Sequence, residues 1–148
     1  MPATERMCVL LPVATGMRWA VPQNCLAELV TVPAADNRVP ALVEWRGQSV
    51  PVLDLASAGA AEWRDPKSQT GLVAVFLGLR ERSPDYWAVA LRGEGLGVRR
   101  IDFADCVETD NGSEFALATF ELDGELYGVP DLPALQAFAC RTAERATA

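Results

Sequence analysis

Histidine is absent from all 148 residues of the sequence. Its absence excludes catalytic triads built on an imidazole, most zinc sites and the most common general base. Lysine occurs only once, at Lys67, so almost every positive charge is an arginine. No segment holds the roughly 20 consecutive apolar residues that a membrane-spanning helix needs. Direct insertion into a membrane is therefore not expected.

The four cysteines are Cys8, Cys25, Cys106 and Cys140, and none of them forms a CxxC pair. Their wide and irregular spacing supports neither a metal site nor a redox motif. The first apolar run is short and contains Pro12, which is not typical of a signal peptide. We therefore expect free thiols, no bound metal and no cofactor, in a cytoplasmic protein.

The net charge is −7, and the acidic residues are unevenly placed. Residues 102–131 hold nine acidic residues and no lysine or arginine. Such a surface repels phosphate groups, so nucleic acid and anionic membranes are not expected as partners. Half of the residues are hydrophobic, which is enough for the core of one domain.

Apolar segments bounded by glycine, proline and asparagine predict a mainly β protein. We expect strands at residues 8–13, 17–21, 71–77, 86–91, 96–101 (extended by 103–107), 115–122 and 125–129. At residues 26–32, periodicity does not distinguish a helix from a strand. A helix is expected to begin after Asp131 as N-cap, with Pro133 in its first turn. Its apolar face would be formed by Leu132, Leu135, Phe138 and Ala139.

The most distinctive pattern is VPALVEWRGQSVPVLDL, at residues 39–55. Two apolar arms flank the polar segment Arg46-Gly47-Gln48, which predicts a hairpin with the glycine in its turn. Trp45 and Arg46 lie next to the predicted tip. A tryptophan there is either part of the core or an exposed anchor for a partner, and the pattern leaves both open.

The two halves of the chain resemble each other, which predicts a duplicated unit. The segment Arg18-Trp19-Ala20-Val21 matches Tyr86-Trp87-Ala88-Val89. Gly47 and Gly124 lie in matching hairpins, and each is followed seven residues later by an Asp-Leu pair. Each half is thus predicted to contain a similar strand, a connection, a glycine hairpin and an Asp-Leu pair after the hairpin.

The hairpin also resembles the signature of a known family. Trp45-Arg46-Gly47, then Val50-Pro51-Val52, then Asp54-Leu55 is similar to the hairpin of CheW-like domains, which occur in chemotaxis coupling proteins and in their partner kinases. The Trp-Arg-Gly-Gln version resembles divergent members from pilus-linked chemosensory systems, such as ChpC-like proteins. The resemblance implies a single domain over residues 7–140, mainly β, with two SH3-like five-stranded β-barrel subdomains, a groove between them and a C-terminal helix. The subdomains would be roughly residues 7–56 and 71–140, linked by 57–70.

The same resemblance implies a non-enzymatic cytoplasmic adaptor. It would couple the cytoplasmic tip of a methyl-accepting chemoreceptor to the regulatory domain of a CheA-type histidine kinase, at the inner face of the membrane in receptor arrays. The output would be chemotaxis or type IV pilus (twitching) motility.

The residues carried over from the family are Glu28, Arg46 and Gly47. Glu28 matches an acid in the helical turn after the second strand, which pairs with the arginine of the hairpin. Leu26, Leu29 and Val30 would either line a groove for a helical partner or belong to the core.

Two other functions remain open from the residues alone. A small β-barrel enzyme would use acids such as Asp54, Glu121 or Asp123, since Glu121 and Asp123 would share one face of a strand as hydrolytic pairs do. That enzyme would need a pocket in which two carboxylates converge. A generic SH3-like peptide-binding module would instead show an aromatic-lined open groove on one barrel and no repeat.

Overall fold

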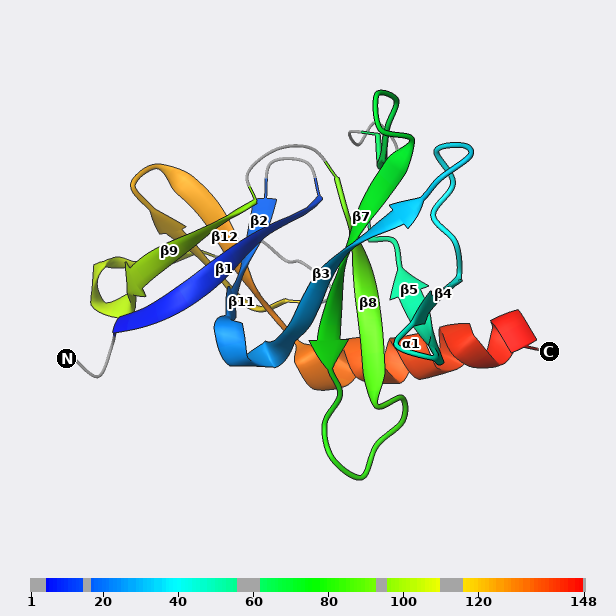
Figure 1. Ribbon diagram of the computed structural model, residues 1–148. Coiled ribbons are helices and arrows are strands. Elements are labelled where there is room, and N and C mark those ends of the chain that lie inside the picture. The colour runs from blue at the N-terminus through cyan, green and yellow to red at the C-terminus, as the bar shows by residue number, and fades with distance from the viewer. Residues whose placement is uncertain (1–4, 15–16, 56–61, 93–95, 110–115, 148) are drawn as a thin grey trace.

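The structure, a computed structural model, describes residues 5–14, 17–55, 62–92, 96–109 and 116–147. Two β-sheets and one long helix make up this part of the chain (Figure 1). The sheet that we name the terminal sheet has the order β10-β11-β12-β2-β1-β9. Its strands are β1 (Glu5–Ala14), β2 (Met17–Pro22), β9 (Gly97–Asp102), β10 (Val107–Thr109), β11 (Ala116–Leu122) and β12 (Glu125–Pro130).

The second sheet, named the central sheet, has the order β3-β7-β8-β5-β4, with β6 paired to β7. Its strands are β3 (Leu26–Pro33), β4 (Leu42–Trp45), β5 (Gln48–Leu53), β6 (Arg64–Asp65), β7 (Thr70–Leu77) and β8 (Tyr86–Leu91). Two short 3-10 helices, η1 (Gln23–Cys25) and η2 (Phe103–Asp105), and the helix α1 (Leu132–Thr147) complete the described elements. The mainly β prediction with a C-terminal helix is confirmed, and each sheet has six strands where five were predicted.

The sheets do not follow the predicted division into sequential halves. The first half of the chain gives β1 and β2 to the terminal sheet, and β3, β4 and β5 to the central sheet. The second half gives β7 and β8 to the central sheet, and β9 to β12 to the terminal sheet. Each half therefore gives its first two strands to one sheet and its later strands to the other, and the two units are interwoven.

The internal repeat is visible in the pairing. The matched strands β2 and β8 each pair in parallel with the second strand of a hairpin, β12 and β5 respectively. The two hairpin turns also share one backbone geometry. Arg46 and Gly47 have φ of 49° and 79°, and Asp123 and Gly124 have φ of 52° and 79°. Positive φ at both central residues is the geometry of a type I′ turn, which matches the twist of the flanking strands and favours glycine at the second position.

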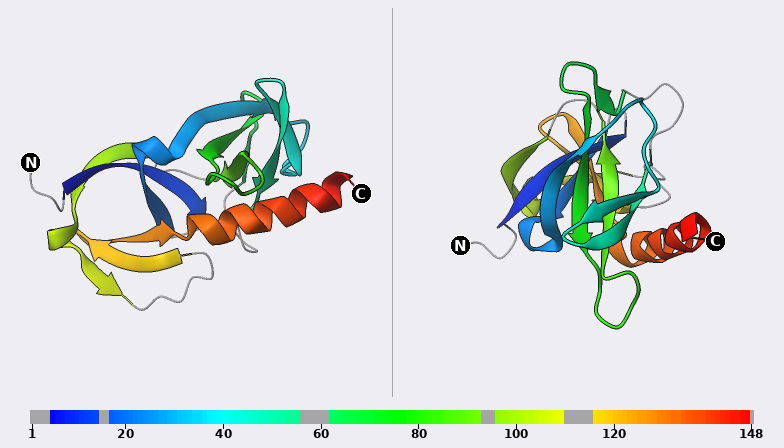
Figure 2. Two further views of the ribbon diagram at one scale, coloured as in Figure 1. Left: turned by 90° about the horizontal axis from the view of Figure 1, so that it is seen from below. Right: turned by 45° about the vertical axis from the view of Figure 1, so that its right-hand side comes forward.

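The central strands bury both faces, which explains their continuous apolar sequences. In β7, Ala74 and Phe76 face the other sheet, whereas Val73 and Val75 face the interior of the curled central sheet. The strand β1 does the same in the terminal sheet, with Leu11 toward the other sheet. Figure 2 shows how the strands of the terminal sheet curl round rather than lying flat. The described residues thus form three apolar clusters, one inside each curled sheet and one between the sheets.

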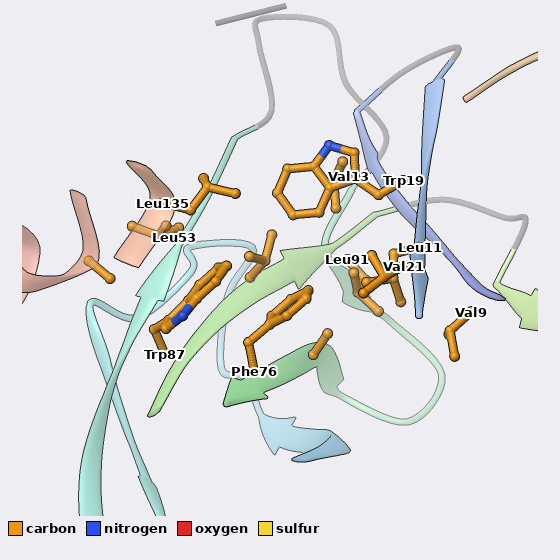
Figure 3. Close-up of a cluster of buried hydrophobic side chains, with 13 residues drawn as sticks. Val9, Leu11, Val13, Trp19, Val21, Leu53, Phe76, Trp87, Leu91 and Leu135 are labelled. Carbon is orange, nitrogen blue, oxygen red and sulfur yellow. The ribbon is translucent and has the colours of Figure 1, made fainter. Parts of the chain in front are cut away.

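The cluster between the sheets brings the two matched tryptophans together around one phenylalanine (Figure 3). The rings of Phe76 and Trp87 stack with centroids 4.5 Å apart and planes 7° apart. Trp19 meets Phe76 edge-on, with centroids 6.3 Å apart. Offset-stacked and edge-on arrangements are the two that aromatic quadrupoles favour. Trp19 and Trp87 therefore mark the inter-sheet core.

Helix α1 begins where the sequence predicts. The Asp131 carboxylate accepts a hydrogen bond from the Ala134 backbone N–H at 3.2 Å, which satisfies one of the free donors of the first turn. Leu135 and Ala139 are fully buried in the inter-sheet core, and Leu132 and Phe138 pack against it. The helix follows the terminal sheet in sequence and packs on β5 of the central sheet. It therefore ties the two sheets together.

Two local predictions were wrong. Residues 103–105 form the 3-10 helix η2 and do not extend the strand β9. Glu28 lies in the strand β3 and not in a helical turn, because its backbone pairs with Val75 of β7. The cysteines are free, as expected. Within the described residues, no helix is long and apolar enough to cross a membrane.

The predicted linker 57–70 is anchored to the central sheet over its second part, while residues 57–61 lie outside the described residues. Trp63 is buried, and its indole N–H donates to the Leu72 carbonyl at 3.0 Å. The Arg64 guanidinium donates to the Ala34 carbonyl at 2.7 Å. The indole lies so close to Gly71 that a Cβ there would be 2.1 Å from Trp63 Cε2.

The contact between Trp63 and Gly71 predicts that Gly71→Ala destabilises the fold, because the added methyl must displace a buried indole. The expected loss is about 1–3 kcal/mol in the free energy of unfolding, measured by denaturant titration. Gly97→Ala is the matched control, since a Cβ at Gly97 meets nothing within 4 Å. Equal stability of the two variants would contradict the packing described for Trp63.

Candidate functional site

Glu28, Trp45 and Arg46 form one cluster, which we name the Glu28 latch. Glu28 Oε2 accepts a hydrogen bond from the Trp45 indole N–H at 3.1 Å, and Oε1 accepts one from the Arg46 guanidinium at 3.2 Å. The guanidinium also lies over the Trp45 ring, with Cζ 4.6 Å from the ring centroid. Both carboxylate oxygens are thus occupied, and the pairing of Glu28 with Arg46 expected from the resemblance is present.

The latch joins two strands from opposite edges of the central sheet. Glu28 lies on β3 at one edge, and Trp45 ends β4 at the other edge. Three strands separate them in the sheet order, so the sheet must curl for these side chains to meet. The type I′ turn at Arg46-Gly47 places the arginine next to the end of β4.

The electrostatics of the latch favour the ionised carboxylate. The hydrogen bond from Trp45, followed by that from Arg46, holds the pKa of Glu28 below its ordinary value. The arginine side chain is 65% exposed and the glutamate side chain 43% exposed. Trp45 is only 5% exposed, and its ring packs against Tyr86 with centroids 4.9 Å apart. The tryptophan therefore belongs to the core, and the arginine is the most exposed of the three side chains of the latch.

The three apolar residues predicted near Glu28 do not share one surface. Leu29 is 39% exposed and pairs with Ala74, on the side of β3 that faces the other sheet. Leu26 packs against the same inter-sheet core. Val30 points the other way and packs against the cluster inside the central sheet. Alternation along a strand explains the split, so only Leu26 and Leu29 remain candidates for a groove between the sheets.

A second cluster, which sequence reasoning missed, lies in the terminal sheet, and we name it the Tyr127 latch. The fully buried Tyr127 hydroxyl donates to the Glu125 carboxylate at 2.6 Å and accepts from Arg18 at 3.1 Å and from Arg99 at 3.3 Å. Arg18 is ion-paired with Glu125, and Arg99 with Asp123. The hydroxyl therefore uses one donor and two acceptor positions, its full capacity. Burial, followed by the hydrogen bond to Glu125, raises the pKa of Tyr127.

The Tyr127 latch corresponds to the Glu28 latch in position and differs in charge. In both, the first turn residue of a hairpin is ion-paired with a strand at the far edge of its sheet, Arg46 with Glu28 on β3 and Asp123 with Arg99 on β9. The repeat carried a signal for this site, because Asp123-Gly124 matches Arg46-Gly47. No sequence signal indicated that Arg99 would be the partner of Asp123, because that pairing depends on how the sheet curls.

Two shallow hollows flank the Tyr127 latch, with volumes of about 290 and 340 Å³. The first is lined by Arg99, Arg100, Asp102, Asp105, Leu122 and Asp123. The second is lined by Leu10, Arg18, Leu96, Gly97, Val98, Arg99, Glu125 and Tyr127. Most of the charged groups in them are already paired with each other, so neither hollow presents a set of unpaired ligands. Among the described residues, no group of three or more acidic or cysteine side chains is placed to hold a metal ion.

The carboxylates suggested for an enzyme do not converge. Asp54 is held by Arg92 through two hydrogen bonds, at 3.1 and 2.6 Å. Asp123 sits in the turn and pairs with Arg99. Glu121 lies on β11 beside Val107 of β10. Acids neutralised by separate arginines lack the shared geometry of a hydrolytic pair.

No protein-family model matches this sequence, and no curated protein sequence matches it. Among solved structures, the chain is similar to the scaffolding protein CheW from Thermoanaerobacter tengcongensis, with a TM-score of 0.56 and 12% sequence identity. The match covers 88% of this chain and 89% of that protein. The chain therefore has the CheW fold. At 12% sequence identity this similarity establishes the fold only. A function must be argued from the residues of this chain.

The lowered pKa of Glu28 predicts an acid-sensitive latch. A carboxyl whose pKa falls on folding stabilises the protein above its unfolded pKa, near 4.5, and that stabilisation is lost as the pH falls through the lower folded pKa. We therefore expect Glu28→Gln to be less stable than the unmodified protein at neutral pH, with the difference shrinking on acidification. Denaturant titrations at a series of pH values measure this difference in the free energy of unfolding. Glu108→Gln controls for the loss of one exposed charge, and parallel profiles for all three proteins would contradict the role of the latch.

The saturated hydroxyl of Tyr127 predicts that Tyr127→Phe is costly. Its removal takes one hydrogen bond from each of two arginines and from one carboxylate, which keep only their ion pairs, and the expected loss is about 1–3 kcal/mol. Tyr86→Phe is the matched control, because among the described residues the Tyr86 hydroxyl has no hydrogen-bond partner. Thermal unfolding of both variants makes the comparison. A Tyr127→Phe protein as stable as Tyr86→Phe would show that the network contributes nothing to stability.

Proposed function

We propose that this protein is a non-enzymatic adaptor that couples a chemoreceptor to the regulatory domain of a CheA-type histidine kinase. The observation that carries the proposal is the Glu28 latch, present in a chain with the CheW fold. It combines the Arg-Gly hairpin with the acid that the family resemblance pairs to it. The chain offers no competing catalytic geometry among its described residues, because the candidate carboxylates are separate and two of them are paired with arginines.

The latch suits a binding surface because it fixes an exposed charge. Arg46 is restrained from two sides, by the Glu28 carboxylate and by the Trp45 ring, yet its side chain stays 65% exposed. A side chain that is already ordered loses less rotamer freedom when a partner binds. Arg46 is thus a preorganised contact on a rigid hairpin, and arginine is enriched among residues that dominate binding energy.

The mechanism is coupling through binding alone. An adaptor that contacts both a receptor and a kinase links the conformational equilibria of the two, and coupling energies of about 1–3 kcal/mol are typical of such linkage. Leu26 and Leu29, which face the space between the sheets, are the candidates for contact with a receptor helix. The adaptor acts in the cytoplasm, at the inner face of the membrane, where receptor arrays lie. The Trp-Arg-Gly-Gln version of the hairpin supports an output through type IV pilus motility.

A binding titration against the kinase regulatory domain and the receptor tip from the same organism tests this proposal. The unmodified protein is expected to bind both. Arg46→Glu is expected to weaken binding to the kinase domain by at least about tenfold, equivalent to about 1.4 kcal/mol. Arg38→Glu, at the opposite end of the central sheet, is the charge-matched control. Absence of binding by the folded, unmodified protein to either partner would refute the adaptor.

The exchanged pair Glu28→Arg with Arg46→Glu separates a structural role from a contact role. It rebuilds an ion pair of reversed polarity at the same place. Recovery of binding in the exchanged protein would mean that the pair only closes the sheet. We expect stability to recover only in part, because an arginine at position 28 restores the ion pair but cannot accept the hydrogen bond from the Trp45 indole N–H. Binding is expected to stay weak, because a partner that meets Arg46 would meet a negative charge instead.

A further inference from the structure

The first position of the turn between β4 and β5 holds an arginine that the turn itself does not favour. Arg46 has a φ of 49°, in the left-handed region that asparagine, aspartate and glycine adopt with the least strain. The matching turn follows this preference, because Asp123 occupies the same position with a φ of 52°. Strained positions of this kind gather at binding and switch segments. The presence of an arginine here must therefore depend on its side chain.

Closure of the sheet through Glu28 uses only a small part of the Arg46 guanidinium. The Glu28 carboxylate accepts one hydrogen bond from Nη2 at 3.2 Å, and among the described residues the guanidinium donates to no other acceptor. A guanidinium presents its N–H groups in parallel pairs along its edges. Nη2 has one hydrogen on each of the two edges that it shares, so one pair stays complete whichever hydrogen Glu28 accepts. Arg46 thus keeps a two-donor edge open on a side chain that is 65% exposed.

The Trp45 ring fixes the plane of that edge. The guanidinium lies over the ring, with Cζ 4.6 Å from the ring centroid. Trp45 is 5% exposed, packs against Tyr86 with centroids 4.9 Å apart, and donates its indole N–H to Glu28 at 3.1 Å. The ring is therefore held by the core and by the same carboxylate that binds Arg46. The plane and the direction of the guanidinium are both set before a partner binds.

A carboxylate is the group that fits such an edge. Its two oxygens match a parallel pair of N–H groups, and these charge-assisted bonds are stronger than neutral hydrogen bonds. Arg92 shows the same chemistry within this chain, since its Nε and Nη2 donate to the two oxygens of Asp54 at 3.1 and 2.6 Å. A phosphate group would bring roughly two negative charges beside Glu28, where a carboxylate brings one. In a chain of net charge −7 the carboxylate is therefore favoured.

We propose that the open edge of Arg46 receives a carboxylate of the kinase regulatory domain, with Trp45 as the positioning residue that presents the edge. The proposal rests on the adaptor function, which assigns Arg46 to contact with the kinase domain, and it adds the chemical group that Arg46 contacts. It requires an exposed aspartate or glutamate on that domain. It also explains why the aspartate of the matching turn does not stand at position 46, where its charge would repel the carboxylate.

Arg46→Lys separates the two-donor edge from the charge, because lysine keeps the charge and lacks the planar fork. In a titration with the purified kinase regulatory domain, we expect it to bind at least about tenfold more weakly than the unmodified protein. Arg38→Lys, the same exchange at an exposed arginine between β3 and β4, is the matched control and should bind normally. Equal affinities of the two variants would overturn the proposal and leave the adaptor function intact. An unmodified protein that fails to bind the kinase domain would overturn the adaptor function itself.

Arg46→Asn separates binding from folding. Asparagine suits the first position of this turn, and exposed ion pairs contribute little to stability. Glu28 also keeps the hydrogen bond from Trp45. We therefore expect a free energy of unfolding close to that of the unmodified protein, together with a loss of kinase affinity at least as large as for Arg46→Lys. A variant that loses stability and keeps its kinase affinity would assign Arg46 to the fold alone. A loss confined to receptor binding would also contradict the proposal.

The carboxylate is located by reversing charges on the kinase domain. Its exposed aspartates and glutamates are replaced by arginine one at a time, and each folded variant is titrated with Arg46→Glu. One replacement is expected to restore at least about tenfold of the lost affinity while weakening binding to the unmodified protein. If none of them does so, Arg46 does not bind a carboxylate of this domain.

Trp45→Phe tests the positioning role, because it keeps an aromatic ring and removes the indole N–H. The variant is combined with Arg46→Lys in a double-mutant cycle, with kinase affinity as the measurement. We expect Trp45→Phe to weaken binding when Arg46 is present and to have little effect beside Arg46→Lys, because the orientation matters only for an edge that exists. Equal losses in the two backgrounds would show that Trp45 acts independently of Arg46, and the positioning role would be wrong.

Discussion

Closing a curled sheet is the constraint on which the rest of this structure depends. In the central sheet the backbone ladder ends at β3 on one side and at β4 on the other, so hydrogen bonding between strands does not join the two edges. The indole and guanidinium of one edge instead meet the carboxylate of the other. Side-chain contacts thus join the two edge strands, which in a complete barrel are joined by backbone hydrogen bonds. Because the clusters inside the sheets form only when the sheets curl, the apolar cores and the polar latches depend on each other.

Local chemistry made much of the fold predictable. The glycine turns, the apolar arms and the Asp131 cap each depend on residues close in sequence, and each lies where the pattern indicated. That β3 and β9 join sheets with strands of the other half was not predictable, because the composition of a strand does not specify which sheet it joins. Their partners are set by packing between segments more than 40 residues apart, such as Leu29 beside Ala74. A duplicated sequence indicates that two units exist, but not that they share strands.

The same limit applies to the candidate site. Glu28 and Arg46 are 18 residues apart and were found through a resemblance, whereas Arg18 and Glu125 are 107 residues apart and no local pattern connects them. The two latches also show how duplicated units diverge. Turn geometry was kept, while Arg46 in one turn corresponds to Asp123 in the other. One latch leaves a restrained arginine open to solvent, and the other is organised around a buried hydroxyl, so the first is suited to recognition and the second to holding the fold.

The interweaving of the two halves also governs the order in which the protein can be made. Strands β1 and β2 leave the ribosome before the strands that complete their sheet, β9 to β12, and the strands of the central sheet lie between them in sequence. Until then, the apolar faces of β1 and β2 have no sheet to pack in, and exposed strand edges favour aggregation. The central sheet can assemble earlier, because all its strands are synthesised by Leu91. Its inter-sheet face, which includes Phe76 and Trp87, then provides an apolar surface on which β1 and β2 can pack before their own sheet is complete.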